Sequence, residues 1–290
     1  MGLLPELQRL LHRHVDQTLL PSVVVKASET VTEPMPHVTD PVFALIAQGA
    51  KRAIVGDTVY DYKAGEYLVV SLELPVTAHV SEAPYVALGL RLEPALIAGL
   101  LLETAGDRGP ADTPGIAVSA ASEELLDPVV RLIRLLDRPA DLPVLGAAIE
   151  REIVWRLITG EQGAMVRQIG LADSRLAQIS RAIRWIRQNY ADPFRVEDAS
   201  RVAGMSVTSF HRHFRAVTTM TPIQYQKQIR LQEARARLIT EPHDVAGVGY
   251  AVGYGSPSQF SREYRRMFGA PPGADAARLQ GMPQIDPVGV

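Results

Sequence analysis

The chain has 290 residues, of which 47% are apolar, and a formal net charge of −2 at neutral pH. This length and apolar content suffice for two domains with separate cores. The absence of cysteine excludes disulfides and thiolate catalysis. The sequence has no run of 18 apolar residues and no signal-like N-terminus, so we expect a cytoplasmic protein without a membrane segment.

The N-terminal half predicts a β-rich domain. From about Pro34 to Leu92, short apolar stretches alternate with Gly, Pro, Asp or charged turns, and short strands at this spacing are typical of a small β-barrel or jelly roll. Gly56-Asp57 and Ala64-Gly65-Glu66 are predicted hairpin turns. The predicted strands are Phe43–Gln48, Arg52–Val55, Thr58–Tyr62, Tyr67–Ser71, Thr77–Val80 and Val86–Arg91.

Histidines are too few and too scattered in this region to predict a metal site. Such a site needs two or three His and a carboxylate that converge. Only His37 and His79 lie among the predicted strands, and the paired His12 and His14 precede them in an amphipathic stretch. We therefore predict no metal and no cofactor.

A pocket for a small organic effector is the preferred function of this barrel, because barrel mouths are common ligand sites. Gln48, Lys51 and Tyr67 are possible lining residues. Alternation along the strands does not say which of them face inward, so the ligand-binding residues stay unknown.

Helices are predicted after the strands. Ser122–Asp137 has an apolar face, and Asp141 is the predicted N-cap of a helix over Leu142–Thr159. These faces are too apolar to be exposed, so they pack on the barrel, form a homodimer interface, or do both. Gly160–Asp173, rich in Gly and polar residues, is the predicted linker.

A first helix-turn-helix is predicted at Val196–Arg215. Val196, Ala199, Val202 and Ala203 fall at helical spacing and form one apolar face. Gly204 then supplies the positive φ that a tight helix–helix turn needs.

The second helix of this unit begins after Ser206, a predicted N-cap. Val207, Phe210 and Phe214 share one face and point into a core. The opposite face carries hydrogen-bonding and cationic side chains: Thr208, Ser209, His211, Arg212 and Arg215. An amphipathic helix pair with merely solvated arginines is the alternative interpretation.

The same pattern recurs at Asp244–Arg265, fifty residues after the first copy. Val245, Val248 and Val252 predict a short helix, and Ser256 with Pro257 predicts the start of the next one. In that second helix the aromatic residues Phe260, Tyr264 and Phe268 face inward, while the outward set is Ser258, Gln259, Ser261 and Arg262. Two copies in one chain favour a protein that enters the major groove of duplex DNA twice.

The charge of the chain is split between its two parts. From Arg181 onward there are 15 Lys and Arg against 9 Asp and Glu, a net of +6, whereas the preceding part has 15 against 23, a net of −8. A basic tail on an acidic body is typical of a DNA-binding module joined to another domain.

Two segments carry a resemblance to a known family. Phe210–Tyr225, FHRHFRAVTTMTPIQY, and Tyr250–Pro272, YAVGYGSPSQFSREYRRMFGAPP, resemble the two signatures of the AraC/XylS family of bacterial transcription regulators. The resemblance covers about 183–272. It implies recognition helices at about Ser206–Ala216 and Ser256–Met267, joined by a long helix over about Pro222–Leu238. DNA contacts would then come from Thr208, Ser209, His211, Arg212, Arg215, Ser258, Gln259, Ser261 and Arg262.

Three departures from the family pattern bear on local stability. Thr219 stands where Gly is usual, Gly249 stands where Ala is usual, and Gly273-Ala274-Asp275 replaces the Tyr that commonly follows the final Pro-Pro.

The N-terminal stretch FALIAQGAKRAIVGDTVYDYKAGEYLVVSLELPVTAHV resembles the cupin-like domain of one AraC subgroup, over about residues 20–170. The predicted fold is therefore an α+β multidomain chain: a cupin-like β-barrel with helices, then an all-α double helix-turn-helix. We expect an effector-binding and dimerisation domain at 1–172 and a DNA-binding domain at 173–290.

The predicted function is sequence-specific, effector-controlled regulation of transcription. The expected partners are double-stranded DNA, an unidentified small organic effector, a second copy of the chain and RNA polymerase. The sequence leaves the sign of regulation open; activation is the interpretation adopted. The alternatives are a cupin-type enzyme targeted by its DNA-binding domain, which metal analysis would reveal, and a DNA-bridging protein with little sequence preference.

Overall fold

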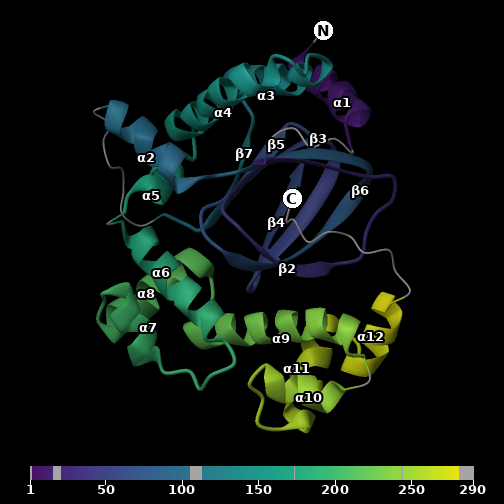
Figure 1. Ribbon diagram of the computed structural model, residues 1–290, viewed down its shortest axis with the longest axis vertical. Helices are drawn as coiled ribbons and strands as arrows, with labels where there is room; N and C mark the ends of the chain where they lie inside the picture. Colours follow the sequence, from purple (N-terminus) through teal and green to yellow (C-terminus); the bar gives the residue numbers. More distant parts are fainter. Residues whose placement is uncertain (1, 16–20, 105–112, 173, 243, 281–290) are drawn as a thin grey trace. The chain divides into compact units, whose positions relative to one another are not determined.

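The computed structural model describes residues 2–15, 21–104, 113–172, 174–242 and 244–280. The chain divides into two compact units. The first runs to Ser180 and includes the short segment Ala216–Thr219, and the second comprises Arg181–Arg215 and the chain from Met220 onward, so that the first boundary along the sequence falls inside one helix. Figure 1 shows a strand-rich first unit and a second unit made of helices. This is the predicted α+β architecture, whereas the domain boundary at 172/173 stays a prediction.

The first unit is built on a seven-stranded antiparallel sheet with the order β1-β6-β3-β5-β7, in which β2 also pairs with β6 and β4 with β3. The strands are β1 (Val23–Ser28), β2 (Met35–Thr39), β3 (Val42–Val55), β4 (Thr58–Lys63), β5 (Glu66–Val70), β6 (Leu74–Arg91) and β7 (Ile116–Ala120).

Two long, bent strands organise this sheet. The start of β3 pairs with β5 and its end pairs with β4, while β6 runs alongside both parts. The register between β3 and β6 shifts around Gly49, which has φ 76°. A Cβ at Gly49 would lie 2.4 Å from the carbonyl oxygen of Glu82, so only glycine fits this bend.

The bends explain where the strand predictions were wrong. Phe43–Gln48 and Arg52–Val55 are parts of the single strand β3, and Thr77–Val80 and Val86–Arg91 are parts of β6. Local turn signals marked the bends as strand ends. The predicted strands also do not include β1, β2 and β7, which lie outside or at the margin of the predicted strand-rich region from about Pro34 to Leu92.

Of the two predicted hairpin turns, one is confirmed. Gly56-Asp57 joins β3 to β4 with Val55 opposite Thr58. Ala64-Gly65 is also a turn, with φ 85° at Gly65, but β4 and β5 pair with different parts of β3 and not with each other. It is therefore not a hairpin.

Helices cover one face of this sheet (Figure 1). They share a buried apolar core with Phe43, Val69 and Leu88 of the strands, which confirms the predicted packing of the helical faces on the barrel. The helices are α1 (Leu3–Arg13), α2 (Pro94–Glu103), α3 (Glu123–Arg134), the short 3-10 helix η1 (Leu135–Asp137), α4 (Leu142–Thr159) and α5 (Gly163–Gly170).

The predicted linker is wrong for most of its length. Within Gly160–Asp173 the chain forms α5, and Met165 and Val166 of this helix are buried in the core of the first unit. The many glycines suggested a flexible segment, whereas three-dimensional packing on α2 and α4 stabilises a helix there. Asp173 itself lies outside the described residues.

The second unit contains two helix-turn-helix pairs and the long α9 between them. The helices from Arg175 onward are α6 (Arg175–Gln188), α7 (Val196–Ala203), α8 (Val207–Thr218), α9 (Pro222–Thr240), α10 (Val245–Ala251), α11 (Pro257–Phe268) and α12 (Pro272–Gln280). The bounds of α8, α9 and α11 agree with the prediction within two residues. Among the described residues, no helix is long and apolar enough to cross a membrane.

Several local predictions in this unit need correction. Val202 is 36% exposed, because the buried face of α7 runs through Ala199, Ser200 and Ala203. Ser256 occupies the N-cap position of α11 but its side chain makes no capping hydrogen bond. In the first unit the same holds for Asp141 at the start of α4.

The departures from the family pattern have structural counterparts. Thr219 adopts φ 62°, the left-handed region in which glycine carries no penalty. Gly249 lies against the buried ring of Phe260, and a Cβ there would approach the ring to 2.9 Å. Close packing of α10 on α11 therefore accounts for this glycine.

Asp275, the third departure, is fully buried at the start of α12 and joins three helices. It accepts hydrogen bonds from Arg235 of α9 at 2.8 Å, from the Tyr264 hydroxyl of α11 at 2.9 Å and from Arg278 at 3.0 Å. Burial alone would raise the pKa of Asp275, but these donors hold that pKa below its ordinary value.

Candidate nucleic-acid interface and ligand pockets

The first recognition helix, α8, separates an apolar face from a polar one. Phe210 and Phe214 are fully buried, and the Phe214 ring meets Tyr225 of α9 edge-on with centroids 5.7 Å apart. Gly204 turns the chain with φ 69°, and the Ser206 hydroxyl accepts from the backbone N–H of Ser209 at 3.3 Å. The turn, the cap and the inward face of α8 are as predicted.

The outward face of α8 carries the predicted DNA-contacting residues. Thr208, His211, Arg212 and Arg215 are exposed and Ser209 is half-buried. Arg212 contacts the neighbouring imidazole of His213 at 3.2 Å. Arg215 has no hydrogen bond or ion pair within the described parts of the chain, so its guanidinium is available to an external anion.

The second recognition helix, α11, repeats this arrangement. Phe260 and Tyr264 are fully buried, with ring centroids 5.6 Å apart, and Pro257 begins the helix. On the opposite face Ser258, Gln259 and Arg262 are exposed and Ser261 is half-buried. Arg262 has no polar partner among the residues the structure covers.

Gln259 is less free than the sequence suggested. Its amide donates to the Glu263 carboxylate at 3.1 Å, and Glu263 also accepts from Lys227 of α9 at 3.0 Å and from the Tyr254 hydroxyl at 2.9 Å. Burial alone would raise the pKa of Glu263, but these donors hold that pKa below its ordinary value. Glu263 therefore stays ionised and orients the Gln259 amide.

Arg230 of α9 connects the two helix-turn-helix pairs, a role that sequence reasoning missed. Its guanidinium donates to the carbonyl oxygens of Tyr190 at 2.6 Å and Asp192 at 2.8 Å, in the loop before α7. It also donates to the carbonyl oxygen of Gly253 at 2.9 Å, in the turn before α11. One side chain thus links the loop before α7, in the first helix-turn-helix pair, to the turn before α11, in the second.

Arg265 and Arg266 are further exposed cations on α11 that were not among the predicted contacts. They follow Arg262 by three and four residues, so they lie on neighbouring parts of the helix surface. The sequence signal was present in the run Arg262–Arg266, but the family pattern directed attention to the start of the helix.

The cavity described inside the sheet has little room for a ligand. Side chains from six strands, β2 to β7, surround one cavity of about 10 Å³, room for about one water molecule. Of the three residues considered as pocket lining, only Lys51 faces it. Gln48 contacts His12 of α1 at 2.6 Å, and Tyr67 packs on Phe43 in the core under the helices.

Lys51 is a buried cation whose neighbours around this cavity are six apolar side chains and those of His37, Thr39 and Tyr62. Burial, together with the positive charge of Lys26, lowers the pKa of Lys51 from 10.5 to about 8. Burial and the charge of Lys51 also lower the pKa of the adjacent His37 to about 4, so this imidazole is neutral. Across the described ranges, no three His, Asp or Glu side chains are placed to hold a metal ion.

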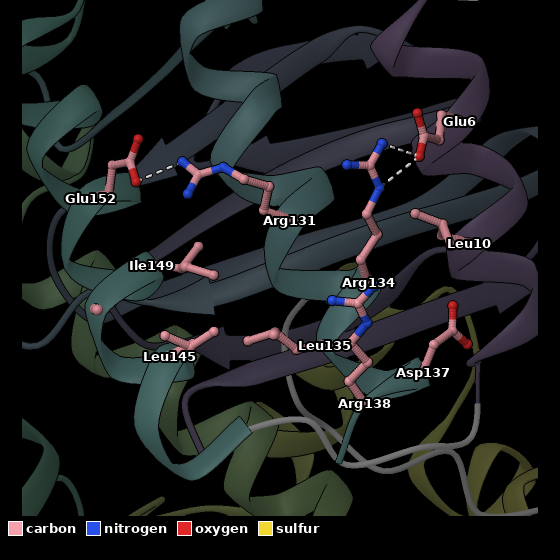
Figure 2. A pocket seen from close by; sticks show the side chains of 11 residues that line it. Glu6, Leu10, Arg131, Arg134, Leu135, Asp137, Arg138, Leu145, Ile149 and Glu152 are labelled. Carbon is pink, nitrogen blue, oxygen red and sulfur yellow. Dashed lines mark hydrogen bonds and ion pairs between the residues drawn. The ribbon is translucent and has the colours of Figure 1, made fainter. Parts of the chain in front are cut away.

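A much larger pocket lies in the helical layer instead. It has a volume of about 720 Å³ and is lined by α1, α3, η1, the segment after η1, and α4 (Figure 2). Its polar lining consists of three arginines and three carboxylates, and its apolar lining of Leu10, Leu135, Leu145, Ala148 and Ile149. We call it the helical groove.

A sheet covered by helices, followed by a double helix-turn-helix, defines a class of two-domain DNA-binding regulators. Comparison with protein families gives the same class. Residues 19–165 match the model of the AraC-type transcriptional regulator N-terminus, and residues 199–278 match that of a helix-turn-helix domain. The chain belongs to the AraC family of transcription regulators.

Individual relatives are distant. The transcriptional activator RhaS of Salmonella schwarzengrund (strain CVM19633) is 26% identical over 149 residues, which are 51% of this chain and 52% of RhaS. The chain thus spans about half the length of the curated relatives it matches.

Solved structures show the same fold. A structure of ToxT from Vibrio cholerae has a TM-score of 0.56 at 10% identity and covers 90% of this chain and 100% of ToxT. Wild-type ToxT of strain SCE256 bound to an unsaturated fatty acid has a TM-score of 0.55 at 10% identity, with coverages of 93% and 100%.

Proposed function

We propose that the protein is a sequence-specific DNA-binding transcription regulator that responds to a small organic effector. The observation that carries this proposal is the duplicated helix-turn-helix, in which both recognition helices bury aromatic residues and expose hydroxyl, amide and guanidinium groups. Such side chains are the ones that read base edges and phosphates in the major groove.

The two recognition helices would enter successive major grooves on one face of the duplex, about 34 Å apart. Arg212 and Arg262 would each make a strong contact, bidentate to guanine or charge-assisted to phosphate. The hydroxyl and amide groups beside them would contribute base selectivity. Arg215 would add a phosphate contact near the end of α8.

Effector control rests on the first unit, which matches the N-terminal domain of the family. The ligand would act by binding one arrangement of the regulator better than another, since a ligand shifts an equilibrium only by its differential affinity. Homodimerisation and contact with RNA polymerase complete the proposal. Val144 of α4, 74% exposed, is consistent with an interface on that helix.

Arginine substitutions on the recognition helices test the DNA face. We expect Arg212→Ala and Arg262→Ala each to weaken binding to an operator found by genome-wide mapping by about 1–3 kcal/mol, with the fold unchanged. Arg91→Ala, which removes the same charge from the first unit, should leave affinity unchanged. Operator affinities equal to the parent's in both recognition-helix variants, at fixed salt, would refute the assignment.

An enzyme with a DNA-targeting domain is the main alternative. The family consists of transcription regulators, and lack of enzymatic activity in this chain remains a prediction. Stoichiometric metal that survives dialysis and is lost in His37→Ala or His79→Ala would favour the enzyme.

A further inference from the structure

The helical groove combines apolar walls with one guanidinium, that of Arg138, for which no ion-pair partner lies among the described residues. Its volume of about 720 Å³ lies within the range of small-molecule sites in proteins. The inner cavity of the sheet, at about 10 Å³, is far too small for such a molecule. If the first unit binds an effector, the groove is a described pocket of suitable size.

Two of the three arginines in the groove are already neutralised. Arg131 donates to Glu152 at 2.6 Å and to Asp127 at 2.9 Å. Arg134 donates to Glu6 at 2.8 Å. Figure 2 shows the Arg131 guanidinium turned toward Glu152 and the Arg134 guanidinium turned toward Glu6.

The third arginine, Arg138, has no partner in the described ranges. The remaining carboxylate of the groove, Asp137, is engaged by Arg13 at 3.4 Å and His14 at 3.2 Å. With every lining carboxylate in an ion pair, the groove has an open guanidinium and no free acid to satisfy it. A ligand that complements this charge is an anion.

The surroundings of Arg138 define the rest of the ligand. Leu135 and Ile149 are buried side chains in the wall beside it, and Leu145, 44% exposed, extends this wall toward solvent (Figure 2). Burial of apolar ligand surface on these side chains would provide affinity, and the guanidinium would fix the orientation of the charged end.

We propose that the helical groove binds an amphipathic organic anion, with its acidic group on Arg138 and its apolar body on Leu135, Leu145 and Ile149. The proposal deepens the effector part of the proposed function by naming the site and the chemical class of the ligand. A second copy of this chain is the competing occupant. A copy that covered Arg138 would have to supply a carboxylate to it, because an ionised group buried without a partner is costly.

A pair of fluorescent probes tests the charge and the apolar wall separately. 8-Anilinonaphthalene-1-sulfonate is an apolar anion, and N-phenyl-1-naphthylamine is its uncharged counterpart. On the full-length protein, we expect Arg138→Gln to weaken binding of the anion about tenfold or more and to leave binding of the neutral probe unchanged. Arg138→Lys should retain part of the preference for the anion.

Two further variants serve as controls. Arg91→Gln removes an exposed charge outside the groove, one that pairs with Glu93 at 3.8 Å, and should bind both probes like the parent. Leu145→Asn, at a partly exposed position, should weaken both probes, because it removes apolar wall without changing charge. Equal anion affinity in the parent and Arg138→Gln would overturn the proposal.

The competing occupant gives a different result. A parent dimer that excludes both probes, and a Leu145→Asn monomer that admits them, would assign the groove to a second copy and overturn the ligand proposal. Failure of the parent to bind its operator would count against the proposed function alone, because the probe measurements do not involve DNA.

Discussion

Lys51 shows how a single residue can oppose the stability of its own domain. Its side chain lies in an apolar interior, 8% exposed, and no described carboxylate forms an ion pair with it. A buried charge without a partner shifts its pKa or destabilises the fold. The sequence prediction left Lys51 between two strands and named it as a possible lining residue. It gave no signal that Lys51 faces inward, because β3 changes register just before it.

The lowered pKa of Lys51 predicts a specific pH dependence. Below pH 8 the Lys51 side chain is protonated in the folded chain, and the full desolvation free energy of its buried charge opposes folding. Between about pH 8 and 10.5 the folded state releases the proton while the unfolded state keeps it, so stability rises with pH. We expect Lys51→Met to raise the unfolding free energy by roughly 3 kcal/mol at pH 7, a gain that shrinks as pH rises through this window.

Urea unfolding followed by Trp155 fluorescence measures this effect. A Trp185→Phe background leaves Trp155 of α4 as the only tryptophan, so the signal reports on the first unit. Lys63→Met, at an exposed position of β4, is the matched control and should change little. A gain for Lys51→Met that is independent of pH would show that Lys51 does not titrate in this range.

At the scale of elements, sequence periodicity predicted the two helix-turn-helix pairs well and the sheet less well. Caps, turns and aromatic spacing within α8 and α11 are local signals, so short windows of sequence contain them. The continuity of β3 and β6 depends on pairing between segments far apart in the chain, which no local window contains. The mistaken linker has the same cause: α5 is stabilised by contacts with α2 and α4.

Arg230 is a further element-scale feature that the sequence alone could not reveal. Its four carbonyl partners belong to two separate segments, the loop before α7 and the turn before α11. A pattern of arginines on a helix does not indicate which of them turn inward to carbonyl groups. The geometry makes Arg230 a positioning residue for the pair of recognition helices.

Replacing Arg230 should uncouple the two pairs. We expect Arg230→Met to lower the unfolding free energy by about 2–4 kcal/mol, because charge-assisted hydrogen bonds to partly buried carbonyls are lost. Below its melting temperature the variant should bind a full operator more weakly than the parent does. It should bind DNA that contains one half of the operator as tightly as the parent does, because the contacts within each recognition helix are intact.

Arg237→Met is the control for this comparison, since Arg237 lies on the same helix and, within the described part of the chain, its side chain donates to the hydroxyl of the half-buried Tyr190 alone, at 3.1 Å. It should leave binding to both DNA molecules unchanged. A uniform loss of affinity for full and half operators in Arg230→Met would argue for general destabilisation and against a positioning role.

At the scale of the whole molecule, charge and packing both separate the two units. The part from Arg181 onward has a net charge of +6, opposite in sign to the −8 of the preceding part. The second unit also has its own buried core around Phe260 and Tyr264, and the Asp275 network fastens α12 to it. A unit with its own core and ion-pair network has the means to fold alone.

A fragment comprising residues 173–290 should therefore fold and recognise the same operator as the full chain. If the first unit dimerises, the fragment should bind the operator more weakly than the full chain. In a dimer, binding of one DNA-binding unit raises the effective concentration of the other at the operator, and the fragment lacks this gain. Circular dichroism measures folding, and a salt-controlled titration measures binding, with Arg262→Ala in the same fragment as the negative control. A fragment that is helical by circular dichroism but does not distinguish operator from random DNA would show that sequence recognition needs the first unit.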